Sequence, residues 1–400
     1  MIRGKQRLGM ATALVLSSTL GLVTLFVAAG CSVSDLVSGS TDDAPPGSIV
    51  WNDPSPIPSR NVPDDATYVG VEVCAACHGR SAPGHPEGIY AEWKQMAHAK
   101  DPTKLGGSGT IDIFTRFISD GLVPNTPCAI CHVTGAPDTP NNPGSDRGGF
   151  DTNKDARSAH NLKFWSVQCE ACHGPGSAHV ASGGNRNLIN RIPDSKETCW
   201  KCHTGLPNTK GVTPEGPATD DLIALFSSSL ARGHNAGIMI AGAGGYEYPG
   251  VEYKHSPHTR IANTCQTCHA LATGSSRRWN HTSTLPKKEV CAKCHGGANN
   301  AADIEHVVVN SSGETVEDIQ EHIADLLIQL GGSTSSGAPD NNANGGALRA
   351  YRDTYGQDAK YRRARWNYSL VINDGSLGVH NYDYAKQLLL SSLADLAAGP

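Results

Sequence analysis

Apolar and polar positions divide the chain into regions of different character. Residues 8–30 form an uncharged apolar run behind three basic residues, Arg3, Lys5 and Arg7. This order of charge and hydrophobicity is typical of an export signal. Residues 31–66 are rich in Ser, Pro, Asp and Gly and follow neither helical nor strand periodicity, which favours a flexible linker. Sustained helical periodicity appears only in the last hundred residues.

Residues 301–400 contain no cysteine and are predicted to be a helical region. Thr315 and Asp318 form a capping-box pattern, and an apolar stripe follows at helical spacing: Val316, Ile319, Ile323, Leu326, Leu327 and Leu330. His322 lies near this stripe and is read as a packed helix residue. Residues 331–346 are read as a loop, and 347–372 as a second helix. Asn381 is a good N-cap for a last helix, whose expected buried side is Ala385, Leu388, Leu389, Ser392 and Leu396.

The composition is poor in residues that fill a protein interior. Only 38% of the 400 residues are hydrophobic, and the chain has 44 glycines and 24 prolines. Such a chain is loop-rich, so something other than side chains is expected to contribute to the core. The formal net charge is −5 with both signs scattered. No basic stripe is present, and no nucleic-acid partner is expected.

Twelve of the 13 cysteines fall into six copies of the motif Cys-x-x-Cys-His. Two thiols three residues apart in a helical turn lie on one side and can add to the two vinyl groups of one haem, while the adjacent histidine binds the iron. Six haem c groups are therefore predicted. Their covalent attachment points are Cys74, Cys77, Cys128, Cys131, Cys169, Cys172, Cys199, Cys202, Cys265, Cys268, Cys291 and Cys294. The proximal iron ligands are His78, His132, His173, His203, His269 and His295.

Zinc and disulfides are the competing uses of these cysteines. Zinc would require pairs of motifs to combine into four-ligand sites, and neither alternative explains a histidine after every second cysteine. Six large macrocycles would also supply the missing apolar interior. The predicted fold is mostly α and loop-rich, a multihaem cytochrome c fold organised around six covalent haems. We expect a haem-binding region at 67–300 and a helical region at 301–400 that packs on it.

The remaining cysteine, Cys31, follows the apolar run and is preceded by the small residues Ala28, Ala29 and Gly30. This resembles the lipobox of bacterial lipoproteins, in which the cysteine receives lipid after cleavage. Residues 1–30 are then a lipoprotein signal peptide. A simple cleaved signal and an uncleaved membrane helix remain alternatives, because the run is long enough to span a bilayer. Each alternative places the rest of the chain outside the cytoplasm.

The sixth iron ligand is expected to be histidine at most haems. Outside the signal the chain has two methionines, Met96 and Met239, but eleven histidines outside the motifs: His85, His98, His160, His179, His234, His255, His258, His281, His306, His322 and His380. The candidate distal ligands are His98, His179, His255, His258, His281 and His380. Bis-histidine ligation gives lower potentials than Met/His ligation. His179 follows the turn "GPGSA" and cannot easily reach the far face of the haem of its own motif, so it is expected to ligate a neighbouring haem.

Several segments together resemble known multihaem proteins. "YVGVEVCAACHG", "EWKQMAHA", "CAICHVTGAP" and "VQCEACHGPGSAH" resemble the tetrahaem cytochrome that accepts electrons from hydroxylamine oxidoreductase. "ARWNYSLVINDGSLGVHNYDYAKQLLLSSL" resembles the C-terminal helices of pentahaem nitrite reductases and octahaem hydroxylamine oxidoreductases. The resemblance implies stacked and perpendicular haem pairs in a mostly helical, loop-rich body, with His98, His179 and His380 as distal ligands. The Cys-x-x-Cys-Lys motif of the nitrite reductases is absent.

Two functions from different classes fit these features. The first is an electron-transfer protein of an extracytoplasmic respiratory pathway, lipid-anchored on the periplasmic side or at the outer membrane or cell surface. Its partners would be other redox proteins, such as cytochromes and quinol-linked reductases. The second is an enzyme that reduces or oxidises nitrite, hydroxylamine or tetrathionate at one five-coordinate haem. His281, Arg278 or Tyr253 would then donate hydrogen bonds to the bound ligand. The discriminating feature is whether every iron has a sixth protein ligand.

Overall fold

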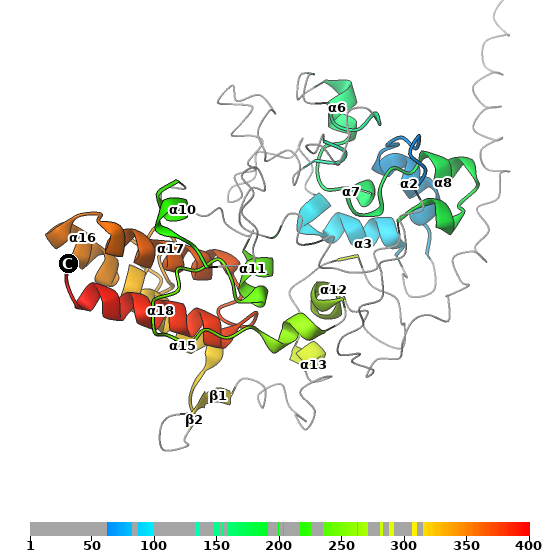
Figure 1. The fold of residues 1–400 in the computed structure, drawn as a ribbon. Helices are drawn as coiled ribbons and strands as arrows, with labels where there is room; N and C mark the ends of the chain where they lie inside the picture. Colours follow the sequence, from blue (N-terminus) through cyan, green and yellow to red (C-terminus); the bar gives the residue numbers. More distant parts are fainter. Residues whose placement is uncertain are drawn as a thin grey trace, which may run out of the picture.

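The computed structural model is mostly helical and loop-rich, as the sequence predicts, and is drawn in Figure 1. It describes residues 62–81, 87–99, 133–136, 147–151, 154, 158–190, 199, 203, 217–225, 235–261, 263–270, 281–282, 288–291, 306–309 and 315–400. Within these residues, no helix has both the length and the apolar character needed to cross a membrane. The signal, the linker up to residue 61 and the second Cys-x-x-Cys-His motif lie outside the described residues.

Short helices occupy the N-terminal half of the described chain, and longer helices occupy the C-terminal part. The short elements are α2 (Val71–His78), α3 (Ile89–Gln95), η2 (Ala97–Ala99), α6 (Ala159–Lys163), α7 (Cys169–His173), α8 (Ser177–Ala181), η4 (Arg186–Leu188), α10 (Asp220–Leu225), α11 (Ala236–Ala241), η6 (Pro257–Arg260), α12 (Thr264–His269) and α13 (Lys288–Cys291). The longer helices are α15 (Ile319–Gly331), α16 (Gly346–Tyr355), α17 (Ala359–Asp374) and α18 (Tyr382–Ala397). Strands β1 (His306–Val309) and β2 (Thr315–Asp318) pair antiparallel before α15.

Helices α15 to α18 pack on one another around a continuous apolar core. Most residues of the predicted stripes lie inside it: Ile323, Leu326, Leu327, Leu330, Ala385, Leu388, Leu389, Ser392 and Leu396 are buried, whereas Ile319 is only partly buried. The close approach of α15 to α17 requires glycine at residue 331, because a Cβ there would lie 2.2 Å from the ring of Tyr368. We call these four helices the C-terminal body.

The segment 235–246 also packs into the C-terminal body, although it lies in the predicted haem region. Ile238 and Met239 belong to the same buried cluster as the long helices. The indole nitrogen of Trp366 donates to the Gly244 carbonyl at 2.7 Å. Asn367 accepts from the Tyr246 amide at 2.7 Å and donates to its carbonyl at 3.0 Å. These bonds satisfy the backbone of a loop that would otherwise be buried with unpaired polar groups.

Two element boundaries correct the sequence prediction, and a third confirms it. Residues 315–318 form strand β2 rather than a capping box, so the helix begins at Ile319. The single helix expected at 347–372 is two helices, because Gly356 adopts φ 84° and the Asp358 side chain caps α17 by accepting from the Tyr361 amide. The expected N-cap at Asn381 is confirmed, since its side chain accepts from the Tyr384 amide.

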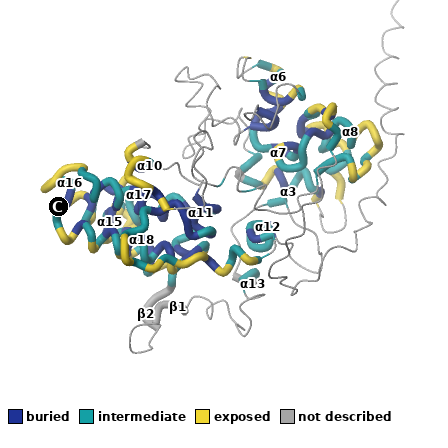
Figure 2. Tube along the Cα trace, viewed as in Figure 1, coloured by how far each residue is buried: buried dark blue, intermediate teal, exposed yellow. Residues whose placement is uncertain are grey.

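The N-terminal half has few buried apolar side chains of its own. Its buried cluster within the described residues consists of Val133, Ala136, Phe150, Phe164 and Trp165. Helix α8 buries no residue, and α2, α7 and α12 bury one each. Figure 2 shows the contrast, with dark blue concentrated inside the C-terminal body and teal along α7 and α12. This is the distribution expected where covalent cofactors take the place of an apolar core.

Candidate haem sites

The Cys-x-x-Cys-His motifs form short helical turns. The first, third and fifth motifs are described in full, and each ends a helix at its histidine: α2 at His78, α7 at His173 and α12 at His269. In such a turn, two thiols three residues apart lie on one side, as the spacing predicts, although Cys77 of the first motif is disulfide-bonded in this structure. Of the other motifs, Cys199, His203 and Cys291 are described, whereas Cys128, Cys131, His132, Cys202, Cys294 and His295 lie outside the described residues.

The first and third motifs lie directly against each other. Helices α2 and α7 are in contact. The neighbouring Cys169 side chain, followed by burial, raises the pKa of Cys74, and Cys74 in turn lowers the pKa of Cys169. The thiol of Cys74 donates to the Gly70 carbonyl at 3.7 Å. Because these sulfurs are haem attachment points in the prediction, the two macrocycles would be neighbours.

Two buried side chains of the third motif region fix the start of the first motif helix. The carboxylate of Glu170 accepts from the amides of Val69 at 2.9 Å, Gly70 at 2.7 Å and Gly176 at 2.8 Å. Gln168 accepts from the Val71 amide at 3.0 Å. Burial raises the pKa of Glu170 despite these hydrogen bonds. Amides that a helix start leaves unpaired are thus satisfied by side chains about 100 residues away.

Four proximal histidines each face a histidine from outside the motifs. The ring centroids are 6.4 Å apart for His78 and His179, 6.1 Å for His203 and His98, 6.3 Å for His173 and His281, and 6.2 Å for His269 and His380. All eight rings are half-buried. We call these the four histidine pairs. His179 faces the histidine of the first motif rather than that of its own, which is the crossed arrangement that the sequence predicts.

The spacing of the pairs fits one iron between two imidazoles. A metal–nitrogen bond of about 2.0 Å and about 1.2 Å from nitrogen to ring centre place each centroid roughly 3.2 Å from the metal. Two rings on opposite faces of a haem are then roughly 6.4 Å apart, whereas two rings on a tetrahedral zinc would be roughly 5.2 Å apart. The observed 6.1–6.4 Å agrees with the first value. The residues therefore fit bis-histidine haems.

Hydrogen bonds on Nδ1 set the tautomer of several of these rings. Nδ1 of His173 lies 2.8 Å from the Asn190 carbonyl, and Nδ1 of His179 lies 2.9 Å from the Asn185 carbonyl. Burial lowers the pKa of His173, and the nearby His179 lowers it further against the carbonyl bond. A neutral ring that donates from Nδ1 presents the lone pair of Nε2, which is the form that binds a metal.

His380 differs because its Nδ1 bond goes to a carboxylate. Nδ1 lies 2.6 Å from Oδ1 of Asp374, whose side chain is 0% exposed. Burial lowers the pKa of His380, but the hydrogen bond to Asp374 and the charges of Asp374 and Cys265 outweigh it, and the pKa is raised. Asn381, the N-cap of α18, holds the adjacent backbone by also donating to the Lys254 carbonyl at 2.9 Å.

One short segment carries side chains toward two of the pairs. The helix expected through His98 ends at Gln95, and His98 lies on the following turn, η2. Trp93 fixes this segment by donating to the Val167 carbonyl at 3.1 Å. The buried Glu92 accepts from the His281 amide at 3.0 Å, and its carboxylate lies 3.8 Å from Nδ1 of His281.

The other candidate ligands have different surroundings. Nδ1 of His255 lies 2.6 Å from the Ala241 carbonyl, but His255 forms no ring pair with a described residue. His258 is on η6, which packs on α12 beside the fifth motif. His322 bonds to the Tyr382 hydroxyl at 2.7 Å, as expected of a packed helix residue. Met239 is buried in the apolar core rather than placed beside a motif. His85 and His234 lie outside the described residues.

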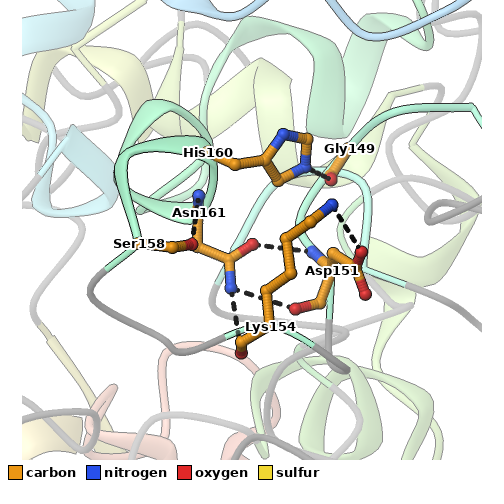
Figure 3. A network of polar contacts seen from close by, with 6 residues as sticks. All are labelled: Gly149, Asp151, Lys154, Ser158, His160 and Asn161. Atoms are coloured by element: carbon orange, nitrogen blue, oxygen red, sulfur yellow. Dashed lines mark hydrogen bonds and ion pairs between the residues drawn. The ribbon is translucent and has the colours of Figure 1, made fainter.

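His160 belongs to a local polar network (Figure 3). Its Nε2 bonds the Gly149 carbonyl at 2.8 Å. Next to it, Asn161 accepts from the Asp151 amide at 2.8 Å and donates to its carbonyl at 2.9 Å, while Ser158 caps the helix. The ring nitrogen that a distal ligand would use is thus directed at a backbone carbonyl. His160 serves this loop rather than a histidine pair.

Sequence reasoning did not find the carboxylates Glu92, Glu170 and Asp374. Each carboxylate hydrogen-bonds a residue that is distant along the chain or lies across a turn. No local motif marks such a carboxylate. The one available signal was the position of Asp374 six residues before His380, on the far side of the break after α17.

Comparison with known proteins supports the haem interpretation. Residues 60–213, which hold the first four motifs, match the model of the family described as outer membrane cytochrome MtrC/MtrF-like, domains II/IV. No curated protein matches the chain. The motifs and the histidine pairs agree with this match to a cytochrome domain over residues 60–213. More particularly, the N-terminal haem region is similar to the MtrC/MtrF-like domains.

Two solved cytochromes are also similar to the chain at low sequence identity. The outer cell wall cytochrome OcwA is 16% identical, with 82% of this chain and 99% of that chain covered and a TM-score of 0.28. The undecahaem cytochrome from the S-layer of Carboxydothermus ferrireducens is 17% identical, with 85% and 70% covered and the same TM-score of 0.28. Such a TM-score is too low to relate the arrangements of their elements. None of these findings supports the narrower resemblance to hydroxylamine oxidoreductases and nitrite reductases.

Proposed function

We propose that the protein is an exported hexahaem cytochrome that passes electrons along a chain of mostly bis-histidine haems. The observation that carries this proposal is the set of four histidine pairs at the spacing of trans ligands on one iron. In each pair a proximal histidine of a motif meets a histidine from elsewhere in the chain. The assignments are His179 to the first haem, His281 to the third, His98 to the fourth and His380 to the fifth.

Each bound haem would supply a one-electron Fe(III)/Fe(II) couple, and the chain would position and tune it. Six-coordinate iron leaves no open site for a substrate, and its ligands need not change on reduction, which suits electron transfer. The contact between α2 and α7 would keep the first and third haems adjacent. Segment 92–98 links the third to the fourth, because Glu92 holds the His281 backbone and His98 faces His203.

The second and sixth haems complete the proposed set through motifs that lie at the edge of, or outside, the described residues. Their distal ligands would come from the remaining candidates, His255 and His258. Both lie in the segment 255–258, beside α11 and α12. The Nδ1 bond of His255 to a carbonyl gives it the same metal-binding tautomer as His173 and His179.

The family description places its members at an outer membrane, and we propose a cell-surface location for this chain as well. The export signal at 1–30 and a lipid on Cys31 would attach it, with residues 31–66 as the tether. Electrons would arrive from other cytochromes supplied by quinol-linked reductases and leave to acceptors outside the cell. The alternative, an enzyme with a five-coordinate haem, receives no support from the four pairs, and His281 faces His173 rather than a substrate pocket.

Electron paramagnetic resonance of the oxidised, haem-loaded protein tests this function. The wild type should show only low-spin ferric haem, with six haems per chain by pyridine haemochrome assay. His179→Ala, His281→Ala, His98→Ala and His380→Ala should each convert one haem to high-spin. His322→Ala is the matched control, because His322 bonds a tyrosine hydroxyl, and it should leave every haem low-spin. A stoichiometric high-spin signal in the wild type would overturn the proposal in favour of the enzyme.

A further inference from the structure

The loop between α17 and α18 holds a buried carboxylate against one distal histidine. Asp374 is the last residue of α17, and its side chain is completely buried. Oδ1 accepts from Nδ1 of His380 at 2.6 Å, and Oδ2 accepts from the hydroxyl of Ser376. The Ser376 hydroxyl oxygen in turn accepts from the His380 amide at 3.2 Å. Gly375 allows this tight turn by adopting φ 72°.

This arrangement is unlike that of the other rings whose Nδ1 bond is described. His173, His179 and His255 bond to neutral backbone carbonyls. The carboxylate of Glu92 lies near His281, but its Oε2 is 3.8 Å from Nδ1 of His281, which is longer than a hydrogen bond. His380 alone among these has its ring bonded directly to a buried negative charge.

A carboxylate bonded to Nδ1 increases the electron donation of the opposite nitrogen to a metal. The more basic ligand stabilises Fe(III) relative to Fe(II), and the negative charge opposes the arrival of an electron. Because Asp374 is shielded from water, salt screens this charge poorly. Second-shell hydrogen bonding and local charge are among the means by which a protein sets haem potential. The more basic ligand and the negative charge would both lower the reduction potential of a haem bound by His380.

We propose that Asp374 is a positioning residue that lowers the reduction potential of the fifth haem, which would be held by His269 and His380. This inference rests on the proposed function. That haem would have a lower potential than the first haem, whose distal ring, His179, bonds a neutral carbonyl. It would therefore accept an electron after the first haem. The C-terminal body, which supplies both Asp374 and His380, would then set the energy of one end of the described haem chain.

Redox titration of the full haem-loaded protein, followed by haem absorption, tests the proposal. Asp374→Asn keeps the shape and one acceptor oxygen but removes the charge. One component should shift to higher potential, with at least a tenfold larger equilibrium constant for reduction, which is about 59 mV for a one-electron couple. Low-spin intensity should stay unchanged. Asp353→Asn, at an exposed carboxylate of α16, is the matched control and should shift no component.

Ser376→Ala provides a second, opposite test that does not depend on Asp374→Asn maturing. It removes the hydroxyl donor from Oδ2 and leaves the charge, so the carboxylate bonds the ring more strongly and one component should shift downward. An unchanged titration in both variants, or a high-spin haem in Asp374→Asn, would overturn the tuning role. Failure of the proposed function is distinguishable, since His380→Ala would then leave all haems low-spin.

Discussion

Glu170 is the side chain through which the first and third haem motifs depend on each other. Its two carboxylate oxygens accept from three backbone amides: Val69 at 2.9 Å, Gly70 at 2.7 Å and Gly176 at 2.8 Å. Glu170→Gln conserves the shape, so it creates no cavity. One oxygen, however, becomes an NH₂ group that faces an N–H donor. At least one hydrogen bond to a charged acceptor is lost, and a buried amide is left without a partner.

The magnitude follows from two opposing effects. A hydrogen bond to a charged group contributes about 1.5–3 kcal/mol, and leaving a buried donor unsatisfied costs about 1–3 kcal/mol. Against this, burial raises the pKa of Glu170, which means that the folded state bears a cost for its charge that glutamine does not. We expect a net loss of roughly 2–3 kcal/mol in the free energy of unfolding. Because both motifs depend on this side chain, the signals of both haems should change together.

Urea unfolding of the haem-loaded protein, followed by haem absorption, measures this loss. Glu72→Gln is the matched control, because Glu72 lies on α2, the helix of the first motif, but is exposed and accepts from the Tyr90 hydroxyl at 3.2 Å. The free energy of unfolding should fall by the expected amount for Glu170→Gln. For the control it should stay within about 0.5 kcal/mol of the wild-type value. Equal midpoints for the two variants would refute the reasoning that Glu170 joins the motifs.

Three further predictions concern the C-terminal body. Burial, followed by the charge of Lys386, lowers the pKa of His322. The neutral His322 ring therefore contributes stability above the unfolded pKa near 6.5, and this contribution is lost as the pH falls through the folded pKa. His322→Gln removes this dependence, so the urea midpoint of the variant should decline less than that of the wild type between pH 7.5 and 5.5. Asn381→Ala removes the N-cap of α18 and should cost about 1 kcal/mol in thermal unfolding, with low-spin haem retained. Gly331→Ala places a methyl group against the Tyr368 ring and should lower the free energy of unfolding in urea by about 1–3 kcal/mol. An unchanged midpoint would contradict the close packing of α15 on α17.

The helical periodicity of the last hundred residues predicted their core well because that core is made of side chains. Ile323, Leu327, Leu388 and Leu389 lie where the stripes place them. The errors came from tertiary contacts that a local pattern does not contain. Thr315 pairs with Val309 of β1 instead of capping a helix, and the turn after Gly356 interrupts a continuous-looking pattern.

The candidate sites divide in the same way. Each motif specifies its own attachment turn, so the turns ending at His78, His173 and His269 were predictable from spacing. The partner of each proximal histidine is set by folding over long distances, for example His78 with His179, and His203 with His98. The role of Glu170 is marked by no local motif, because it bonds amides about 100 residues earlier in the chain.

The two halves of the protein hold their proposed haem ligands by different means. In the N-terminal half, where few apolar side chains are buried, hydrogen bonds such as those of Glu170 and Gln168 position the motif turns. The apolar packing there would come from the haems themselves, so ligand position and cofactor binding depend on each other. His380 instead projects from a body with its own apolar core, capped by Asn381 and braced by Asp374. Because a rigid support can hold a buried charge against one ring without local collapse, a haem ligated by His380 would have its potential tuned independently of its neighbours.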